Sequence, residues 1–137
     1  MKVLFDTNIL IDVLARRSPF YADSKKAMDL AVSGKIDGIV GAGSITDIHY
    51  VIRSRYRDAG DALALIADLV EIVRPADTAA WDVLNAIKSG NADFEDAVIA
   101  ETAVRESANF IVTRNKGDFA KSRVPALLPK ELVEKIG

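Results

Sequence analysis

Short apolar runs alternate along this chain with longer stretches in which apolar residues recur at helical spacing. The apolar runs predict four strands, at 2–5, 36–40, 71–73 and 109–113, and a short fifth at 124–127. The longer stretches predict helices at 7–15, 20–33, 44–57, 60–70, 77–88, 93–107 and from Pro129 onward. Strands that alternate with helices predict an α/β fold, with a parallel sheet covered by helices on both faces.

Length and composition fit one domain with a core of its own. The chain has 137 residues, half of them hydrophobic, and contains no internal repeat or low-complexity linker. We therefore expect a single domain over residues 1–137. The absence of cysteine excludes a disulfide framework, a thiolate metal site and a cysteine nucleophile. It is also compatible with a reducing cytoplasm.

The sequence predicts neither secretion nor a membrane anchor. The first apolar block is interrupted at Asp6, which makes it too short for a signal peptide. No uncharged apolar stretch approaches the about 20 residues that a membrane-spanning helix needs. We expect a cytoplasmic protein without a membrane partner.

The net charge of −2 gives no whole-chain signal for binding a polyanion. Basic residues nevertheless gather in two short segments, and five of them are candidates for phosphate contacts: Arg53, Arg55, Arg57, Arg114 and Lys116. For the first segment a solvated helix end is the alternative, because cations also complement the helix dipole there. Trp81 and Tyr56 could stack on bases, but a place in the core or in a dimer interface is the more ordinary role.

The most informative acid is Asp6, which directly follows the first predicted strand. In open α/β sheets, ligands bind beyond the carboxyl ends of the strands. A carboxylate buried there needs a cation, hydrogen-bond donors or water, because burying the charge alone is costly. The alternative is a simple N-cap for the following helix. Asn8 is expected to support the turn and orient the carboxylate.

Two further acids follow the ends of other predicted strands. Asp47 comes after the second strand, and Asp118 comes after the fourth. Ser44 and Asp47 have the spacing of a capping box, which is the alternative role for Asp47. Asn115 competes with Asp118 as a ligand, since amide oxygens also bind hard cations. A solvated turn anchored by Phe119 is the alternative for this segment.

The remaining acid comes from the helix predicted at 93–107. Asp93 and Asp96 have the spacing of a capping box. Asp96 also shares a helix face with Ala100 and Ala103, so it borders the apolar stripe that faces the core. We therefore prefer Asp96 over Asp93 and Glu95 as the acid that points inward.

Four carboxylates at one edge of the sheet predict a site for divalent metal. Carboxylates packed together repel one another, and some take up protons unless a cation is present. Mg²⁺ and Mn²⁺ prefer oxygen ligands, and a metal held by few carboxylates suits phosphate chemistry.

Four segments carry a resemblance to a known family: residues 3–10, 44–47, 93–97 and 111–119. In this order, across nearly the whole chain, they resemble the PIN-domain nucleases, and within them the VapC-like toxin ribonucleases and their bacterial relatives. The resemblance implies a three-layer α/β/α PIN-like (Rossmann-like) fold with a central, mainly parallel sheet of four to five strands. It also implies hydrolysis of RNA phosphodiester bonds with Mg²⁺ or Mn²⁺, frequent homodimers and often an antitoxin partner.

By position, the resemblance assigns catalysis and metal binding to four acids: Asp6, Asp47, Asp96 and Asp118. It assigns supporting hydrogen bonds to Thr7, Asn8, Ser44 and Thr113. The chain departs from the family pattern at two positions. Many relatives have Glu at position 47 and Asp at position 115, so the fourth ligand stays open between Asn115 and Asp118.

Two other functions compete with a metal-dependent endoribonuclease. Phosphotransfer through an aspartyl phosphate at Asp6 is one, although a haloacid-dehalogenase-like phosphatase would have a second Asp where this chain has Asn8. The other is a catalytically weak PIN module that binds RNA or an antitoxin without cutting. The departures at Asp47 and Asn115 keep that alternative open.

Overall fold

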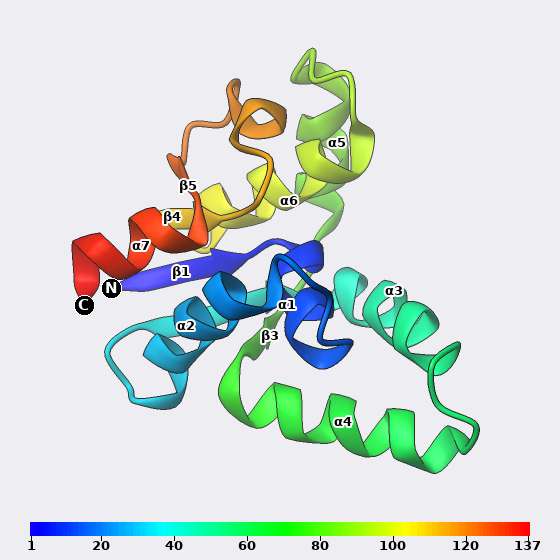
Figure 1. The fold of residues 1–137 in the computed structure, drawn as a ribbon. Coiled ribbons are helices and arrows are strands. Elements are labelled where there is room, and N and C mark those ends of the chain that lie inside the picture. The colour runs from blue at the N-terminus through cyan, green and yellow to red at the C-terminus, as the bar shows by residue number, and fades with distance from the viewer.

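The computed structural model describes residues 1–137, and its chain alternates strands and helices (Figure 1). The elements in chain order are β1 (Lys2–Phe5), α1 (Thr7–Leu14), α2 (Tyr21–Val32), β2 (Asp37–Gly41), α3 (Ala42–Arg53), α4 (Ala59–Ile72), β3 (Arg74–Ala76), α5 (Ala80–Lys88), α6 (Phe94–Arg105), β4 (Phe110–Val112), the 3₁₀ helix η1 (Lys116–Phe119), β5 (Ala126–Leu127) and α7 (Pro129–Ile136). No helix is long and apolar enough to cross a membrane.

The strands form one parallel five-stranded sheet in the order β3-β2-β1-β4-β5. β1 lies at its centre, where Leu4 is in register with Ile39 on one side and Ile111 on the other. These three side chains are at most 1% exposed. Continuous apolar runs suit such strands, because both faces of a parallel sheet are covered.

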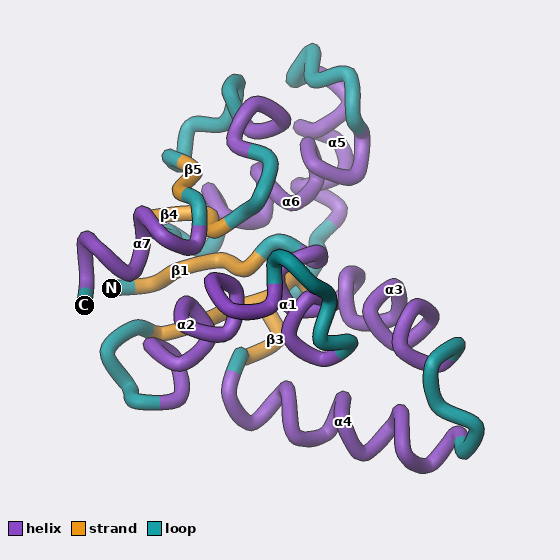
Figure 2. Tube along the Cα trace, viewed as in Figure 1, coloured by secondary structure: helices purple, strands orange, loops and turns teal.

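Successive strand residues point to opposite faces of the sheet, and this divides the core in two. In β1, Val3 and Phe5 join the larger hydrophobic cluster, whereas Leu4 joins the smaller one. The larger cluster takes residues from α1, α2, α3, α4 and α7, and the smaller from α6. Figures 1 and 2 show the resulting three layers, with α5 and α6 on one side of β1 and α1 to α4 on the other. The expected three-layer α/β/α fold with a central parallel sheet is confirmed.

One predicted strand was wrong in position. Residues 71 and 72, expected in a strand at 71–73, instead form the end of α4, and the strand is Arg74–Ala76. β3 contains Pro75, which has no N–H to donate. It tolerates this proline because it is an edge strand that pairs only with β2.

The parallel sheet brings the carboxyl ends of its strands to one edge. Asp6 follows β1, Ala42 begins α3 directly after β2, and Thr113 follows β4. The backbone N–H of Asp6 donates to the carbonyl of Val112 over 3.0 Å, which extends the β1–β4 pairing past the last strand residue. The polar residues that follow these three strands therefore share one edge of the sheet.

Candidate active site

Asp6 stands at the N-cap position of α1, but its side chain does not cap the helix. Its Oδ2 instead accepts a 2.8 Å hydrogen bond from the hydroxyl of Thr113, which is itself fully buried. Asp6 is only 4% exposed. The simple capping role is therefore not what its carboxylate does; the side chain turns across the sheet edge toward the end of β4.

Burial raises the pKa of Asp6 above its usual value. The hydrogen bonds from Thr113 and the backbone of Thr7, and the charge of Arg114, oppose that rise, while the charge of Asp118 adds to it. A buried carboxylate with a raised pKa and few compensating donors is a candidate for a functional site. A bound cation would offset the cost of burying this charge, because it favours the ionised form of Asp6.

Asp96 lies in the first turn of α6 and is half-buried. Its backbone N–H is capped by Oδ1 of Asp93 over 3.0 Å, so Asp93 is the N-cap. No returning bond from the Asp96 carboxylate closes the capping box, since the N–H of Asp93 donates to Asn91 instead. The Asp96 carboxylate is left without a hydrogen-bond partner.

The pKa of Asp96 is raised to about 7. Desolvation by burial is the largest cause, followed by the charges of Asp6, Asp93, Asp118 and Glu95. These acids come from the end of β1, the start of α6 and η1, and the charge of each reaches Asp96. Repulsion between carboxylates thus adds to burial in raising the pKa of Asp96.

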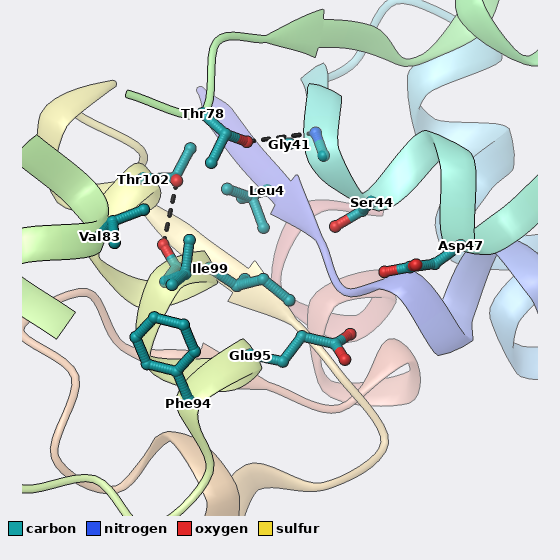
Figure 3. Close-up of a pocket in the computed structure, with 12 residues that line it drawn as sticks. Leu4, Gly41, Ser44, Asp47, Thr78, Val83, Phe94, Glu95, Ile99 and Thr102 are labelled. Carbon is teal, nitrogen blue, oxygen red and sulfur yellow. Dashed lines mark hydrogen bonds between the residues drawn. The ribbon is translucent and has the colours of Figure 1, made fainter. Parts of the chain in front are cut away.

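Asp47 and Glu95 face one another across a cavity at this edge (Figure 3). α3 begins at Ala42, so Ser44 and Asp47 lie inside the helix and do not form the capping box that was the alternative. Glu95, which we had set aside in favour of Asp96, lines the cavity together with Asp47. Partial burial and then the charges of Asp47, Asp93 and Asp6 raise the pKa of Glu95.

Asp118 and Asn115 lie on the exposed loop after β4. Asp118 is in the 3₁₀ helix η1, and its charge reaches both Asp6 and Asp96. The backbone N–H of Asn115 donates to Oγ1 of Thr113 over 3.0 Å, which fixes the hydroxyl that bonds Asp6. Asp118 thus acts on the other acids through its charge, whereas Asn115 acts on Asp6 through its backbone N–H and the Thr113 hydroxyl.

A buried ion-pair network that the sequence did not reveal lies beside Asp6. Asp12 of α1 is fully buried and pairs with Arg17 over 2.9 Å and with Arg114 over 2.8 Å. The hydroxyl of Ser24 donates a third contact of 3.2 Å to the same carboxylate. The Arg114 guanidinium also lies 3.8 Å from the centre of the Phe20 ring. This network ties the loop after β4 to α1 and α2.

The expected supporting residues divide between the Asp12 network and the acid cluster. The acid cluster consists of Asp6, Asp47, Glu95, Asp96 and Asp118. Asn8 accepts a 3.2 Å bond from Arg17 through its Oδ1, so its side chain faces the network. Thr7 Oγ1 is buried without a hydrogen-bond partner beside Asp6. Ser44 is buried at the cavity wall, close to Gly41.

The donor chemistry of the site fits a hard divalent cation. The candidate ligands are carboxylate and hydroxyl oxygens, and the chain has no cysteine and a single histidine. The unpartnered Thr7 hydroxyl is a further free oxygen at this point. No three acidic or histidine side chains are arranged as a group that could hold a metal ion. Water would therefore complete much of the coordination shell of a cation, as is common for Mg²⁺.

The basic residues predicted to contact phosphate lie in different surroundings. Arg55 and Arg57 are exposed, while Arg53 donates to the carbonyls of Tyr56 and Arg57 just beyond the end of α3. Arg53 is nine residues from Ser44, or about 13 Å along the helix. Lys116 forms an exposed ion pair with Glu131 over 3.0 Å.

Arg114 is held by Asp12 and Phe20, so its guanidinium is less free to meet a phosphate than the sequence alone implied. Tyr56 packs against the larger core cluster, so the core role expected for it is confirmed. Trp81 is 45% exposed and belongs to neither cluster, so a core role for it was wrong.

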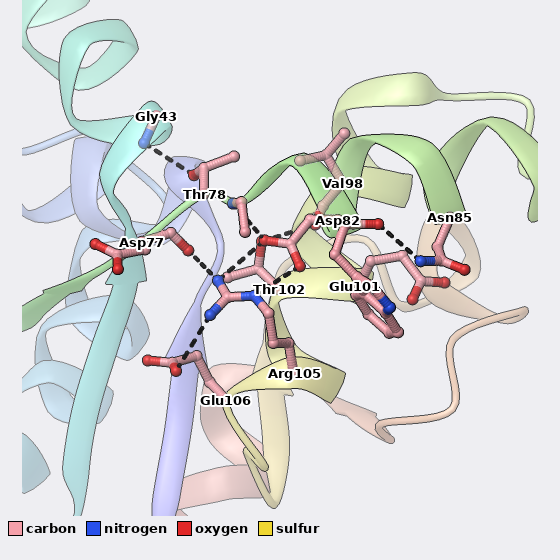
Figure 4. Close-up of polar contacts among 12 residues, drawn as sticks. Gly43, Asp77, Thr78, Asp82, Asn85, Val98, Glu101, Thr102, Arg105 and Glu106 are labelled. Carbon is pink, nitrogen blue, oxygen red and sulfur yellow. Dashed lines mark hydrogen bonds and ion pairs between the residues drawn. The ribbon is translucent and has the colours of Figure 1, made fainter.

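A second buried ion pair fixes α5 on α6 and so shapes the cavity wall (Figure 4). Asp82 is fully buried and accepts from the Arg105 Nε over 2.9 Å and from its NH2 over 3.0 Å. Thr102 and the backbone of Ala79 donate to the same carboxylate. Burial raises the pKa of Asp82, but the bonds from Arg105, Ala79 and Thr102 outweigh burial and hold it below its usual value. Arg105 also donates to the carbonyl of Asp77.

The chain belongs to the PIN domain family. The family profile matches residues 2–117, which include the buried Asp12 network and every acid of the cluster except Asp118. PIN domains are generally nucleases and typically use divalent metals. A search among curated proteins gave no sequence match.

Solved structures with the same fold include chains of two VapBC structures and of a toxin–antitoxin complex. A chain of the VapBC-1 structure from nontypeable Haemophilus influenzae superposes with a TM-score of 0.72 at 18% identity, covering 95% of this chain and 99% of that one. A chain of VapBC2 from Rickettsia felis, bound to a promoter DNA fragment, gives 0.69 at 15% identity, with coverages of 93% and 98%. A toxin–antitoxin complex from Klebsiella pneumoniae gives 0.65 at 20%, with coverages of 93% and 97%. At such identities these likenesses show the fold.

Proposed function

We propose that this protein is a metal-dependent endoribonuclease that hydrolyses RNA phosphodiester bonds. The observation that carries the proposal is the Asp6 carboxylate, which is buried, uncommitted to helix capping and electrostatically coupled to Asp96. Membership of a family of nucleases supports the reaction class. It also makes phosphotransfer through Asp6 the weaker alternative.

Asp6, Asp47, Asp96 and Asp118 would hold the cation, with Glu95 as a further candidate from the cavity wall. When bound, Mg²⁺ or Mn²⁺ supplies an activated water and neutralises charge that develops on the phosphate. Thr113 orients Asp6, and Asn115 in turn orients the Thr113 hydroxyl through its backbone N–H. A bound cation would favour the ionised form of Asp96, whose pKa without metal is raised to about 7.

The test uses the purified chain, a labelled single-stranded RNA, and Mn²⁺ or Mg²⁺ in parallel with EDTA. Cleavage that needs the metal and is lost in Asp6→Asn supports the proposal. Asp68→Asn is the matched control, because Asp68 is an exposed carboxylate on α4, in the layer on the other side of the sheet from α6. Metal-independent cleavage, or full activity in Asp6→Asn, would contradict it.

The catalytically weak module is the second candidate. Two observations favour it: no three acids are arranged to hold a metal, and Asp47 is shorter than the Glu found in many relatives. RNA binding without any cleavage, unchanged by EDTA and by Asp6→Asn, would establish this alternative. The same assay therefore separates the two candidates.

An antitoxin protein is the partner we propose, because the structural neighbours come from toxin–antitoxin complexes. The toxin role follows from that pairing, and its action on RNA would take place in the cytoplasm. Co-expression with the product of the adjacent upstream reading frame tests the partner. We expect that product to co-purify with this chain and to suppress RNA cleavage.

A homodimer is also part of the proposal, and the exposed side of α5 is the surface we assign to it. Trp81, Leu84 and Ile87 recur at every third position of this helix, and each is at least 45% exposed. Apolar residues on one helix face are typical of an interface. Light scattering should give the dimer mass for the parent chain and the monomer mass for Leu84→Glu.

A further inference from the structure

The cavity that Asp47 and Glu95 line also has apolar and aromatic walls. It has a volume of about 320 Å³ and lies at the carboxyl ends of β1 and β2, between α3 and α6. Leu4 lines it from the central strand, and Val98 and Ile99 line it from α6. Small-molecule sites are typically mostly apolar clefts of about 300–1,000 Å³ with a few polar groups, so this cavity has the size of a small ligand site.

An aromatic ring lines the cavity on the α6 side. Phe94 is the first residue of α6 and is 53% exposed, so part of its ring is open to a ligand at the cavity. Figure 3 shows its ring beside the cavity, with the Glu95 carboxylate further along the same wall. Such a ring offers a stacking surface to a flat ligand.

Polar atoms that could bind the edge of a flat ligand lie on the α3 side. The Ser44 hydroxyl makes no hydrogen bond within the chain. Thr78 Oγ1 accepts the N–H of Gly43 over 3.2 Å, which leaves the hydroxyl hydrogen of Thr78 free to donate. A Cβ on Gly43 would lie 3.2 Å from the same oxygen, so the approach of α3 to Thr78 depends on glycine at this position.

The charge of the walls selects against an anion. Asp47 and Glu95 are the ionisable residues that line the cavity, and both are acids. Without a cation on these acids a phosphate or carboxylate would be repelled there, whereas a neutral ring would not. The phosphate attached to such a ring would remain outside the cavity, beside the acids that we propose to hold a cation.

The cavity is also held in shape by contacts outside it. The buried pair of Asp82 and Arg105 fixes α5 to α6, and Thr102 joins that pair from the cavity wall. A preformed apolar slot next to a phosphate-cleaving centre suits an unpaired base, because bases of single strands can be splayed out and stacked on aromatic side chains.

We infer that this cavity is a base-binding subsite, which takes one unpaired nucleobase of the RNA strand next to the phosphate that is cut. The inference rests on the proposed ribonuclease function. Phe94 stacks on the base, and Ser44 and Thr78 contact its polar edge. Base binding here would give the enzyme a sequence or single-strand preference at a single nucleotide.

The experiment measures the affinity of the full chain for a labelled single-stranded RNA in Ca²⁺ buffer, with a gel check that the strand stays intact. A series of RNAs carries one abasic nucleotide at each position in turn. We expect Phe94→Ala to weaken binding of the intact RNA about tenfold, the scale of one base–aromatic stack. At one abasic position, parent and Phe94→Ala should bind equally, because the ring then has no base to contact.

Two further variants make the result specific. Phe94→Tyr keeps an aromatic ring and should restore the affinity, whereas Phe94→Leu should not. Leu63→Ala is the matched control, since Leu63 is an exposed apolar residue of α4 that does not line the cavity. Circular dichroism checks that each variant folds, which the exposure of Phe94 makes the expected result.

Two outcomes overturn the inference. One is that each abasic nucleotide weakens binding equally in the parent and in Phe94→Ala, and the other is unchanged RNA affinity in Phe94→Ala. Unchanged affinity together with a changed oligomeric mass assigns the surface to a second copy of the chain. Cleavage with Mn²⁺ is measured separately. If Phe94→Ala and one abasic position depend on each other but no RNA is cleaved, only the proposed function is refuted. If RNA is cleaved but no abasic position removes the effect of Phe94→Ala, only the subsite is refuted.

Discussion

The hydroxyl of Thr113 donates a 2.8 Å hydrogen bond to Oδ2 of Asp6, joining the ends of two adjacent parallel strands. The residues are 107 positions apart in sequence. Thr113 is fully buried, and its Oγ1 also accepts the N–H of Asn115. The bond therefore fixes the direction of the one deeply buried acid in the cluster and links it to the loop that carries Asp118.

Replacing this hydroxyl should weaken metal binding. Thr113→Val keeps the shape of the side chain but removes the donor, so the charged form of Asp6 loses a partner and its pKa rises further. We expect Mn²⁺ affinity and cleavage to fall about 10- to 100-fold, the usual effect of losing a residue that orients a metal ligand. Isothermal titration with Mn²⁺ and the RNA cleavage assay measure the two effects.

Thr113→Ser is the control for this change, because it keeps the donor and removes only a methyl group. Its Mn²⁺ affinity should stay close to that of the parent chain. Equal losses in the serine and valine variants would assign the effect to packing and not to the hydrogen bond.

The acid cluster should make the metal-free protein less stable as the pH rises. Asp96 has a native pKa of about 7 against an ordinary value of 3.8, so the folded state binds more protons than the unfolded one between these values. The free energy of unfolding therefore falls as the pH rises from about 4 to about 7. We expect a loss of about 1–2 kcal/mol, well below the full linkage value, because the carboxyl is only half-buried and is screened by solvent.

Urea denaturation at pH 4.5 and pH 8 in EDTA measures this loss. Asp96→Asn cannot ionise at this position, so its stability should change less over the same range. Mn²⁺ at pH 8 should restore stability to the parent, since a cation favours the charged carboxylates. Stability that rises steadily with pH in EDTA would contradict the prediction.

The arrangement of the sheet could be predicted because its signals are local. Each interior strand is a short apolar run, and the helices between them have caps or helical periodicity. The third strand was misplaced because Glu71-Ile72-Val73 is apolar and β-branched enough to suit a strand, although tertiary packing keeps Glu71 and Ile72 in α4. Pro75 argued against a strand at 74–76, and only the pairing pattern of the sheet shows that it lies on the edge.

The site could be predicted only as far as strand ends reveal it. Asp6 and Thr113 follow strands directly, so the rule that ligands bind at this edge identifies them. Glu95 was set aside because sequence cannot say which of three neighbouring acids faces a cavity formed with a distant helix. Asp12 could have been suspected, since it lies three residues after the buried Ile9 on a helix face that is otherwise apolar. Its partner Arg114, however, is 102 residues away.

Removal of the Asp12 carboxylate should destabilise the fold. Asp12→Ala leaves Arg17 and Arg114 without their shared partner in a buried setting. Breaking a buried ion pair costs about 3–5 kcal/mol, and we expect about 3 kcal/mol here because both arginines reach solvent in part. Urea denaturation gives the free energy of unfolding.

Asp29→Ala is the control for Asp12, since Asp29 pairs with Lys25 on an exposed helix face. Its stability should be indistinguishable from that of the parent, as is usual for surface ion pairs. In the same Asp12→Ala protein, cleavage per folded molecule should also fall, because Arg114 adjoins Thr113 and favours ionised Asp6. Normal stability in this variant would remove the structural role we assign to Asp12.

Asp82→Asn should weaken the packing of α5 on α6 in a pH-dependent way. The native pKa of Asp82 is lowered by Arg105, Ala79 and Thr102, so its contribution to stability is present above the unfolded value of 3.8 and is lost as the pH falls below it. At pH 7 we expect the variant to be about 2–3 kcal/mol less stable than the parent, because Arg105 loses its charged partner while the amide keeps some of the hydrogen bonds. The difference should narrow below pH 4, where the Asp82 carboxyl of the unfolded parent takes up a proton and the native one does so at still lower pH. Urea denaturation of both proteins from pH 7 to pH 3 measures it, and a difference that stays constant over that range would show that shape, not charge, is what Asp82 contributes.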